Sequence, residues 1–342
     1  MVLGKAALRV DHDTKGTIMQ PTRHSLTVPL NITIGIGEPA RAEPAEVAYV
    51  EGPALEIARP RSYYDGYTGY DPGFLGPELP LPELSGEQRR NAAKNNDAPA
   101  GKDPTVLPYT HFSIVVNRRR QLAYYTVVNI DGGKSATFER QADKWYFDPR
   151  IAESEQIGES LYRRNALDRG HLVRRLDPVW GDDKARANDD TFHFTNCSPQ
   201  HEKFNQGKEL WQGLENFILE NADITDKKMT VFTGPVMDDD DPLYKGARLP
   251  LAFWKVIGYC KPGDALAVSA YMLEQTQLLE DMLGLEAVFD AGTYRVSLAQ
   301  LRERIGLDFG YLEPHETPLT SDGLEVRVDR VPLRNDYSNL VL

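Results

Sequence analysis

Hydrophobic positions are densest in the middle of the chain, where two β-rich runs flank a short polar segment. Residues 111–116 and 121–130 are rich in Val, Ile, Phe and Tyr, whereas residues 117–120 are polar. Two such runs joined by a short polar stretch are typical of a β-hairpin. The sequence therefore predicts two antiparallel strands here. Residues 145–149 are expected to be extended, because Pro149 disfavours helical backbone at the residue before it.

Helical periodicity is clearest further along the chain. Apolar side chains recur about every three or four positions over residues 204–220, which predicts one helix that begins near Asn205. Near the start, residues 26–36 alternate in part between apolar and polar positions, and Pro29 within them predicts an edge strand. The polar stretch 85–105 is expected to be an exposed loop. Further strands are predicted at residues 229–234, 252–260 and 265–272.

The composition is that of a folded protein without a membrane span. The chain has 342 residues, of which 41% are hydrophobic, and its net charge is −12; this excludes wholesale disorder. Apolar runs long enough for a transmembrane helix or a signal peptide are lacking. The two cysteines cannot form a disulfide framework. We therefore expect a cytoplasmic protein that does not bind membranes, and export by another route stays open.

Ala, Pro and Glu dominate residues 38–62, a composition typical of a linker or an extended arm. The sequence predicts that residues 1–62 form an N-terminal arm or linker and that residues 63–342 form one domain. The arm is interpreted as a regulatory segment, as a docking site for a partner, or as the junction to an upstream domain.

Positive charge is concentrated in one part of this acidic chain. Residues 107–175 hold twelve Lys and Arg against eight Asp and Glu, a local charge of +4, so the remaining residues carry −16. Because lysine and arginine neutralise phosphates, this segment is the expected contact with a polyanion.

The same segment holds the residues that could carry chemistry. Residues 168–171 read Asp-Arg-Gly-His, Asn196 follows about thirty residues later, and Asn205-Gln206-Gly207 precedes Glu215. Phosphodiester hydrolysis needs a base that activates water, a cation on the phosphate oxygens, and donors that hold the phosphate. His171 is a suitable base near neutral pH, and Asn205 and Glu215 offer oxygen ligands for a hard cation such as Mg²⁺.

This ordered set of motifs resembles the DNA/RNA non-specific endonucleases of the ββα-metal group, relatives of endonuclease G. The resemblance covers about residues 64–320. It implies an α+β fold with a mixed or antiparallel central sheet flanked by helices, and metal-dependent cleavage of DNA or RNA without sequence specificity. Further landmarks in family order are residues 70–75, 145–150, 232–236, 252–255 and 306–310.

The resemblance implies the central roles in the site. His171 would be the general base, and Asn205 would be the sole direct protein ligand of Mg²⁺, with Mn²⁺ as a substitute. Glu215 would orient water at the metal. The interval from Asn205 to Glu215 is longer than in the family, which implies a bulge, a helix that starts later, or Glu209 in the place of Glu215.

Supporting roles follow from the same resemblance. Asn196 would position His171 or the phosphate, Arg140 would bind phosphate, and Arg169 would add electrostatic support. For Asp168, a hydrogen bond to local backbone and a direct part in the chemistry are both open. Four further arginines are either phosphate contacts or salt-bridged surface residues: Arg163, Arg164, Arg174 and Arg175.

The implied partners are DNA, RNA or both, and possibilities that stay open are a homodimer and a regulatory partner of the N-terminal arm. Two other functions are compatible with the residues. One is a binding or interaction module of the same fold without turnover, suggested by the longer interval before Glu215. The other is a phosphodiesterase that uses His171 and the metal on a small substrate.

Overall fold

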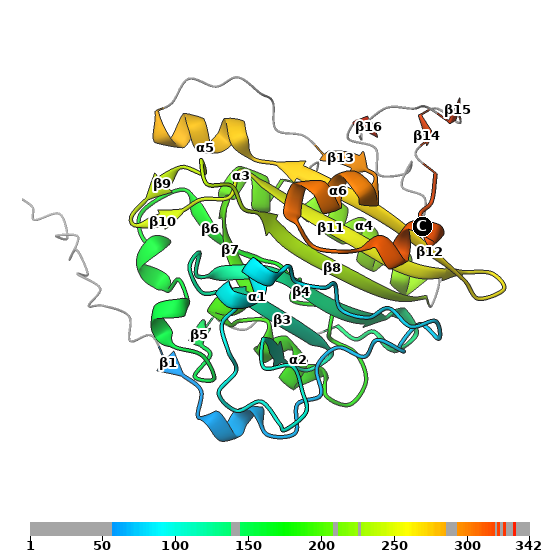
Figure 1. Ribbon diagram of the computed structural model, residues 1–342, viewed down its shortest axis with the longest axis horizontal. Coiled ribbons are helices and arrows are strands. Elements are labelled where there is room, and N and C mark those ends of the chain that lie inside the picture. Colours follow the sequence, from blue (N-terminus) through cyan, green and yellow to red (C-terminus); the bar gives the residue numbers. More distant parts are fainter. Residues whose placement is uncertain are drawn as a thin grey trace, which may run out of the picture. The chain divides into compact units, whose positions relative to one another are not determined.

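The central β-rich runs form part of a large antiparallel sheet (Figure 1). In the computed structural model, β3 (Phe112–Asn117) pairs antiparallel with β4 (Leu122–Asp131), which confirms the predicted hairpin. The sheet has eight strands in the order β16-β13-β12-β11-β8-β4-β3-β2. Its other strands are β2 (Val106–Pro108), β8 (Lys228–Val236), β11 (Ala252–Lys261), β12 (Ala265–Glu274), β13 (Thr293–Val296) and β16 (Val331–Pro332).

The structure describes residues 57–137, 144–207, 211–224, 227–284, 293–318, 320–321, 324–325 and 331–332. All of them belong to one compact unit, Pro53–Leu342. The edge strand predicted at residues 26–36 lies outside the described residues. Within the unit, β1 (Ile57–Ala58) pairs in parallel with β5 (Tyr146–Phe147), at the predicted extended segment. Residues 57–62, which the sequence assigned to the arm, are therefore part of the folded unit.

Both faces of the sheet are covered, so its central strands are buried throughout. On β11, Phe253 and Ile257 pack with α4 (Trp211–Ile224) in one apolar cluster. The alternate residues Trp254 and Val256 pack in a second cluster with α6 (Leu298–Ile305). Since successive side chains of a strand point to opposite faces, the two clusters are the two sides of the sheet. This is the expected α+β architecture, with an antiparallel sheet.

The start predicted for a single helix over residues 204–220 is wrong. The described residues form α3 (Glu202–Asn205) and, separately, α4 from Trp211. The N-cap of α3 is His201, whose Nδ1 accepts a hydrogen bond from the Lys203 amide. Asn205 therefore ends a short helix and does not begin a long one. Gly207, a poor helix former, follows the C-cap, and the later start of α4 accounts for the longer interval to Glu215.

The exposed loop predicted at residues 85–105 is also partly wrong. It contains α1 (Gly86–Asn91), whose first turn is closed by reciprocal hydrogen bonds between Ser85 and Gln88. The Ser-x-x-Gln spacing is a capping box, a helix-start signal that the polar composition concealed. Ala92 and Ala93 directly after the helix are buried.

A two-stranded ribbon lies outside the large sheet and carries the candidate site. In it, β6 (Leu167–His171) pairs antiparallel with β7 (Cys197–His201), and α3 follows at once, giving a β-β-α order in space. None of the described helices is both long and apolar enough to span a bilayer. The remaining elements are η1 (Arg61–Tyr64), η2 (Gly132–Lys134), η3 (Glu153–Glu155), η4 (Glu159–Leu161), α2 (Lys184–Asp190), η5 (Phe194–Asn196), β9 (Leu243–Tyr244), β10 (Ala247–Arg248), α5 (Thr276–Leu283), η6 (Gly310–His315), β14 (Thr320–Ser321) and β15 (Leu324–Glu325).

Candidate functional site

The Asp-Arg-Gly-His motif forms most of β6, and its glycine is required by packing. A Cβ atom on Gly170 would lie 2.0 Å from Oε1 of Gln200, a fully buried side chain on β7. Real Cβ atoms do not come so close to another atom, so only glycine allows Gln200 to lie across β6 at this point. The glycine therefore sets the β6–β7 pairing, and that pairing places His171 opposite Cys197 at the end of the strand.

Asp168 joins the strand to the end of α3. Its Oδ2 accepts one hydrogen bond from Nδ2 of Asn205, at 2.9 Å, and another from Nε2 of Gln206, at 2.8 Å. Because a carboxylate only accepts, these bonds fix which atom of the Asn205 amide is nitrogen. The Oδ1 of Asn205 is consequently turned away from Asp168. Sequence reasoning left open local backbone contacts and a direct part in the chemistry for Asp168, and it missed this long-range contact.

His171 is enclosed by aromatic rings. The Trp145 ring lies 4.8 Å from the imidazole between centroids, and the Phe192 ring lies 5.1 Å away, edge to face. Trp145 immediately precedes β5, and Phe192 follows α2. The imidazole is thus held between side chains from two other segments. Sequence reasoning gave neither aromatic residue a role in the site.

Asn196 fixes the backbone that follows His171. Its Oδ1 accepts from the Val173 amide at 3.0 Å, and its Nδ2 donates to the carbonyls of Val173 and Thr191, both at 2.9 Å. The side chain is fully buried, so it has no surface with which to bind a phosphate. Of the two roles expected for Asn196, the geometry favours positioning of His171.

Arg169 points to the same side of β6 as His171, but a carboxylate neutralises it. Its Nη1 donates to both oxygens of Glu159, at 2.7 and 2.8 Å. The guanidinium also lies 5.6 Å from the centroid of Trp145, the ring that packs on His171. Arg169 therefore orders the aromatic wall of the site and offers little net charge to a phosphate. Arg140, the other predicted phosphate contact, lies outside the described residues.

Glu215 is a buried partner of Lys255. Oε1 of Glu215 and Nζ of Lys255 are 3.5 Å apart, and their side chains are 9% and 1% exposed. Burial raises the pKa of Glu215 and lowers that of Lys255, while each opposes the shift of the other. Asp177 lies in the same environment, where burial raises its pKa to about 7. The structure therefore gives Glu215 an internal partner on the sheet, and Glu209, the alternative, lies outside the described residues.

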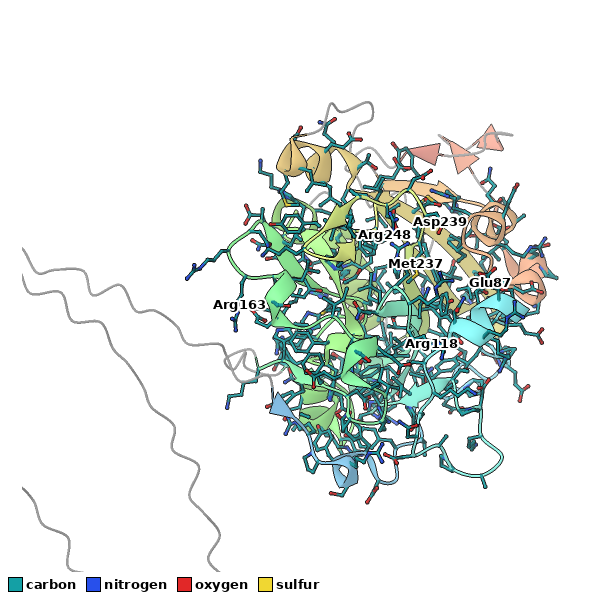
Figure 2. The ribbon with its side chains drawn as sticks, turned by 60° about the vertical axis from the view of Figure 1, so that its left-hand side comes forward. Glu87, Arg118, Arg163, Met237, Asp239 and Arg248 are labelled. Atoms are coloured by element: carbon teal, nitrogen blue, oxygen red, sulfur yellow. The ribbon has the colours of Figure 1, made fainter. Side chains whose placement is uncertain are left out.

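The remaining predicted arginines divide into two groups. Arg174 donates to the carbonyl of Glu215 and to Oδ1 of Asn216, so it binds the side of α4. Arg175 donates to Oδ1 of Asn188 at 3.0 Å and lines a pocket. Arg163 and Arg164 are exposed, and Figure 2 shows Arg163 at the margin of the molecule.

The donor set suits a hard cation. The Oδ1 of Asn205 lies on the far side of an amide that the Asp168 carboxylate holds, and oxygen ligands of this kind are those that Mg²⁺ prefers. Within the described ranges, His, Cys, Asp and Glu side chains do not gather in groups of three or more that could hold a metal ion. A cation at Asn205 would therefore be held mainly by amide oxygen, water and substrate.

Comparisons with known proteins identify the family. The model of the DNA/RNA non-specific endonuclease family matches residues 89–314. The uncharacterized protein y4fB of Sinorhizobium fredii is 41% identical over 293 residues, which is 80% of this chain and 44% of that protein. The chain thus spans less than half the length of this relative. A solved chain from the EndoG/EndoGI complex aligns at a TM-score of 0.46 and 20% identity, covering 66% of this chain and 90% of the other. On the family match, which includes the ββα segment and both His171 and Asn205, the chain belongs to the DNA/RNA non-specific endonuclease family.

Proposed function

We propose that the protein is an endonuclease that hydrolyses phosphodiester bonds of DNA, RNA or both with the help of Mg²⁺. Members of its family depend on a divalent metal ion. The observation that carries the proposal is the hydrogen bond from Asn205 to Asp168 at the end of the ββα segment. It orients the amide oxygen of Asn205 away from Asp168, which lies three residues before His171 on the same strand.

Each residue of the site has a separate proposed role in the hydrolysis. His171 takes a proton from the attacking water, and the rings of Trp145 and Phe192 hold the imidazole in place. Asn205 would hold the cation through Oδ1, and Asp168 positions Asn205. When bound, the ion supplies charge stabilisation on the phosphate and the leaving oxygen. Asn196 acts as a positioning residue beneath His171. We propose products with 5′-phosphates, in keeping with the family.

For Glu215 we propose an indirect role. Its carboxylate is satisfied inside the protein by Lys255, so it stabilises the attachment of α4 to β11 and thereby the α3–α4 segment that bears Asn205. This replaces the water-orienting role that the family resemblance implies. A comparison of stability with turnover separates the two roles and is developed in the Discussion.

The test uses purified protein with supercoiled plasmid and with single-stranded RNA, in Mg²⁺, Mn²⁺ or EDTA. We expect the wild type to cut at least one polymer only with a divalent ion, and His171→Ala and Asn205→Ala to lose cutting while still binding the polymer. Arg90→Gln, at an exposed residue of α1, is the matched surface control and should cut normally. A folded wild type that binds either polymer without cutting would support a binding module. Cutting of an aryl phosphodiester but of neither polymer would support the small-substrate phosphodiesterase.

A further inference from the structure

A small basic pocket adjoins the aromatic wall of His171. Its volume is about 300 Å³, near the lower limit for ligand pockets. Three of its lining residues are cationic and one is anionic, which gives the lining a charge of +2. The lining residues are Arg59, Lys144, Tyr146, Arg175, Asn188, Asp189 and Phe192.

The fold brings the three cations together from distant parts of the chain. Arg59 directly follows β1, and β1 pairs in parallel with β5, so Arg59 lies beside the segment that begins with Lys144. Arg175 comes from the turn after β6, four residues beyond His171. Arg59 also lies before the region matched by the family model, which begins at residue 89. This part of the pocket is therefore formed by a residue that precedes the matched region.

Two aromatic rings and one carboxylate hold the Arg59 guanidinium in the pocket. Its guanidinium lies 4.1 Å from the centroid of Tyr146 and 4.6 Å from that of Tyr63, and Nη2 is 3.3 Å from Oδ2 of Asp189. Within the described part of the chain, its buried Nε has no hydrogen-bond partner. A buried donor without a partner is costly, so an acceptor in the pocket would remove that cost. Arg175 donates to Oδ1 of Asn188, another residue of the lining.

The pocket shares a wall with the catalytic histidine. Phe192 lines the pocket and also packs edge to face on His171, while Lys144 is the neighbour in sequence of Trp145 on the other side of the imidazole. An anion in the pocket would thus lie one side chain away from the reacting group. Since a polynucleotide carries a phosphate at every residue, a strand whose scissile phosphate is at His171 presents another phosphate nearby.

We propose that this pocket binds a non-scissile phosphate of the polynucleotide substrate through Arg59, Lys144 and Arg175. The inference rests on the proposed nuclease function and extends it: the pocket favours polymers over small phosphodiesters. Because the contacts are to the backbone, they add affinity without adding sequence preference.

Binding is measured first, in EDTA, so that no cutting is required. Fluorescent single-stranded DNA, single-stranded RNA and duplex DNA are titrated with full-length wild type, Arg59→Gln and Lys144→Ala at several salt concentrations. We expect each substitution to weaken binding of at least one polymer about tenfold and to lower the slope of log K against log salt by about 0.7 to 0.9. The matched controls are Arg90→Gln and Lys261→Ala, exposed residues that do not line the pocket and lie outside the basic segment 107–175, and both should bind as the wild type does.

Cleavage is measured second, as the ratio of kcat/KM for an oligonucleotide to kcat/KM for an aryl phosphodiester too short to reach the pocket. The pocket variants should lower this ratio about tenfold through KM, and the controls should leave it unchanged. Lys144→Ala removes an exposed side chain, so it guards against misfolding of Arg59→Gln, which also loses the pair with Asp189. Unchanged affinity, salt slope and ratio in both folded pocket variants would overturn the proposal, even if the wild type cuts normally. If the wild type never cuts and the pocket variants bind the polymer more weakly than the wild type does, the nuclease function is overturned and the phosphate pocket is retained.

Discussion

Removal of Lys255 tests whether Glu215 is an internal structural partner. The two charged atoms are 3.5 Å apart and almost without exposure, and Nζ also donates to Oγ1 of Thr233 at 3.2 Å. Breaking a buried ion pair on one side costs about 3–5 kcal/mol, because the other charge stays buried without compensation. In Lys255→Met two carboxylates, Glu215 and Asp177, lose a nearby cation, so we expect a loss of stability in the upper part of that range. Glu215→Gln keeps the shape and a polar contact, and we expect about 3 kcal/mol.

The double variant measures the pairing itself. If Glu215 and Lys255 stabilise each other, the loss in Glu215→Gln/Lys255→Met is smaller than the sum of the single losses by about 1–3 kcal/mol. The assay is equilibrium unfolding in urea, in EDTA, followed by the fluorescence of the tryptophans. Trp211 is a direct reporter, because Nζ of Lys255 lies 4.2 Å from the centroid of its ring.

Two results would refute this reasoning. Single losses below about 1 kcal/mol, or losses that simply add, would show that the pair is not coupled. A Glu215→Gln protein of unchanged stability whose turnover falls more than about a hundredfold would assign the carboxylate to the chemistry, as the family resemblance implies.

Three further changes have defined outcomes. Asp168→Asn should raise the Mg²⁺ concentration for half-maximal cutting by about 10- to 100-fold, because an amide both donates and accepts and no longer fixes the orientation of the Asn205 amide; an unchanged metal titration would contradict the role given to Asp168. Asp177 has its pKa raised from 3.8 to about 7, so the folded protein keeps a proton that the unfolded chain releases, and unfolding free energy should fall as pH rises across that window, by up to about 1.4 kcal/mol per pH unit. Asp177→Asn should flatten this fall in urea titrations between pH 4 and 7, and parallel curves for the two proteins would disprove it. Gly170→Ala should cost about 1–3 kcal/mol, since its Cβ would collide with Gln200, and a wild-type melting temperature would show that β6 and β7 can separate to accept it.

The sequence predicted the elements whose conformation is set by residues close together along the chain. The hairpin of β3 and β4 could be predicted because both strands are apolar and the turn between them is polar. The break between α3 and α4 could not be predicted, since the apolar positions on both sides continue one helical period and only Gly207 interrupts them. The periodicity reports which face is buried, and it does not report whether the backbone is continuous.

The candidate site shows the same limit. The motif singled out His171 and Asn205 as candidates, because each is marked by its immediate neighbours in sequence. The partners that orient them come from elsewhere: Asp168 meets Asn205 across 37 residues, and Trp145 and Phe192 approach the imidazole from two other segments. Such contacts are set by the pairing of β6 with β7, which a single sequence does not display.

The parallel pairing of β1 with β5 has a practical consequence for how the protein can be divided. The tyrosines that follow β1 seal buried polar groups: the hydroxyl of Tyr64 is 2.6 Å from Nε2 of the fully buried His193, and the hydroxyls of Tyr63 and Tyr67 donate to Asp190. A fragment cut to the family boundary at residue 89 would open these groups to water and remove one wall of the basic pocket. The smallest unit that folds and acts as this protein does is therefore larger than the region by which its family is recognised, and expression of the nuclease should begin before β1.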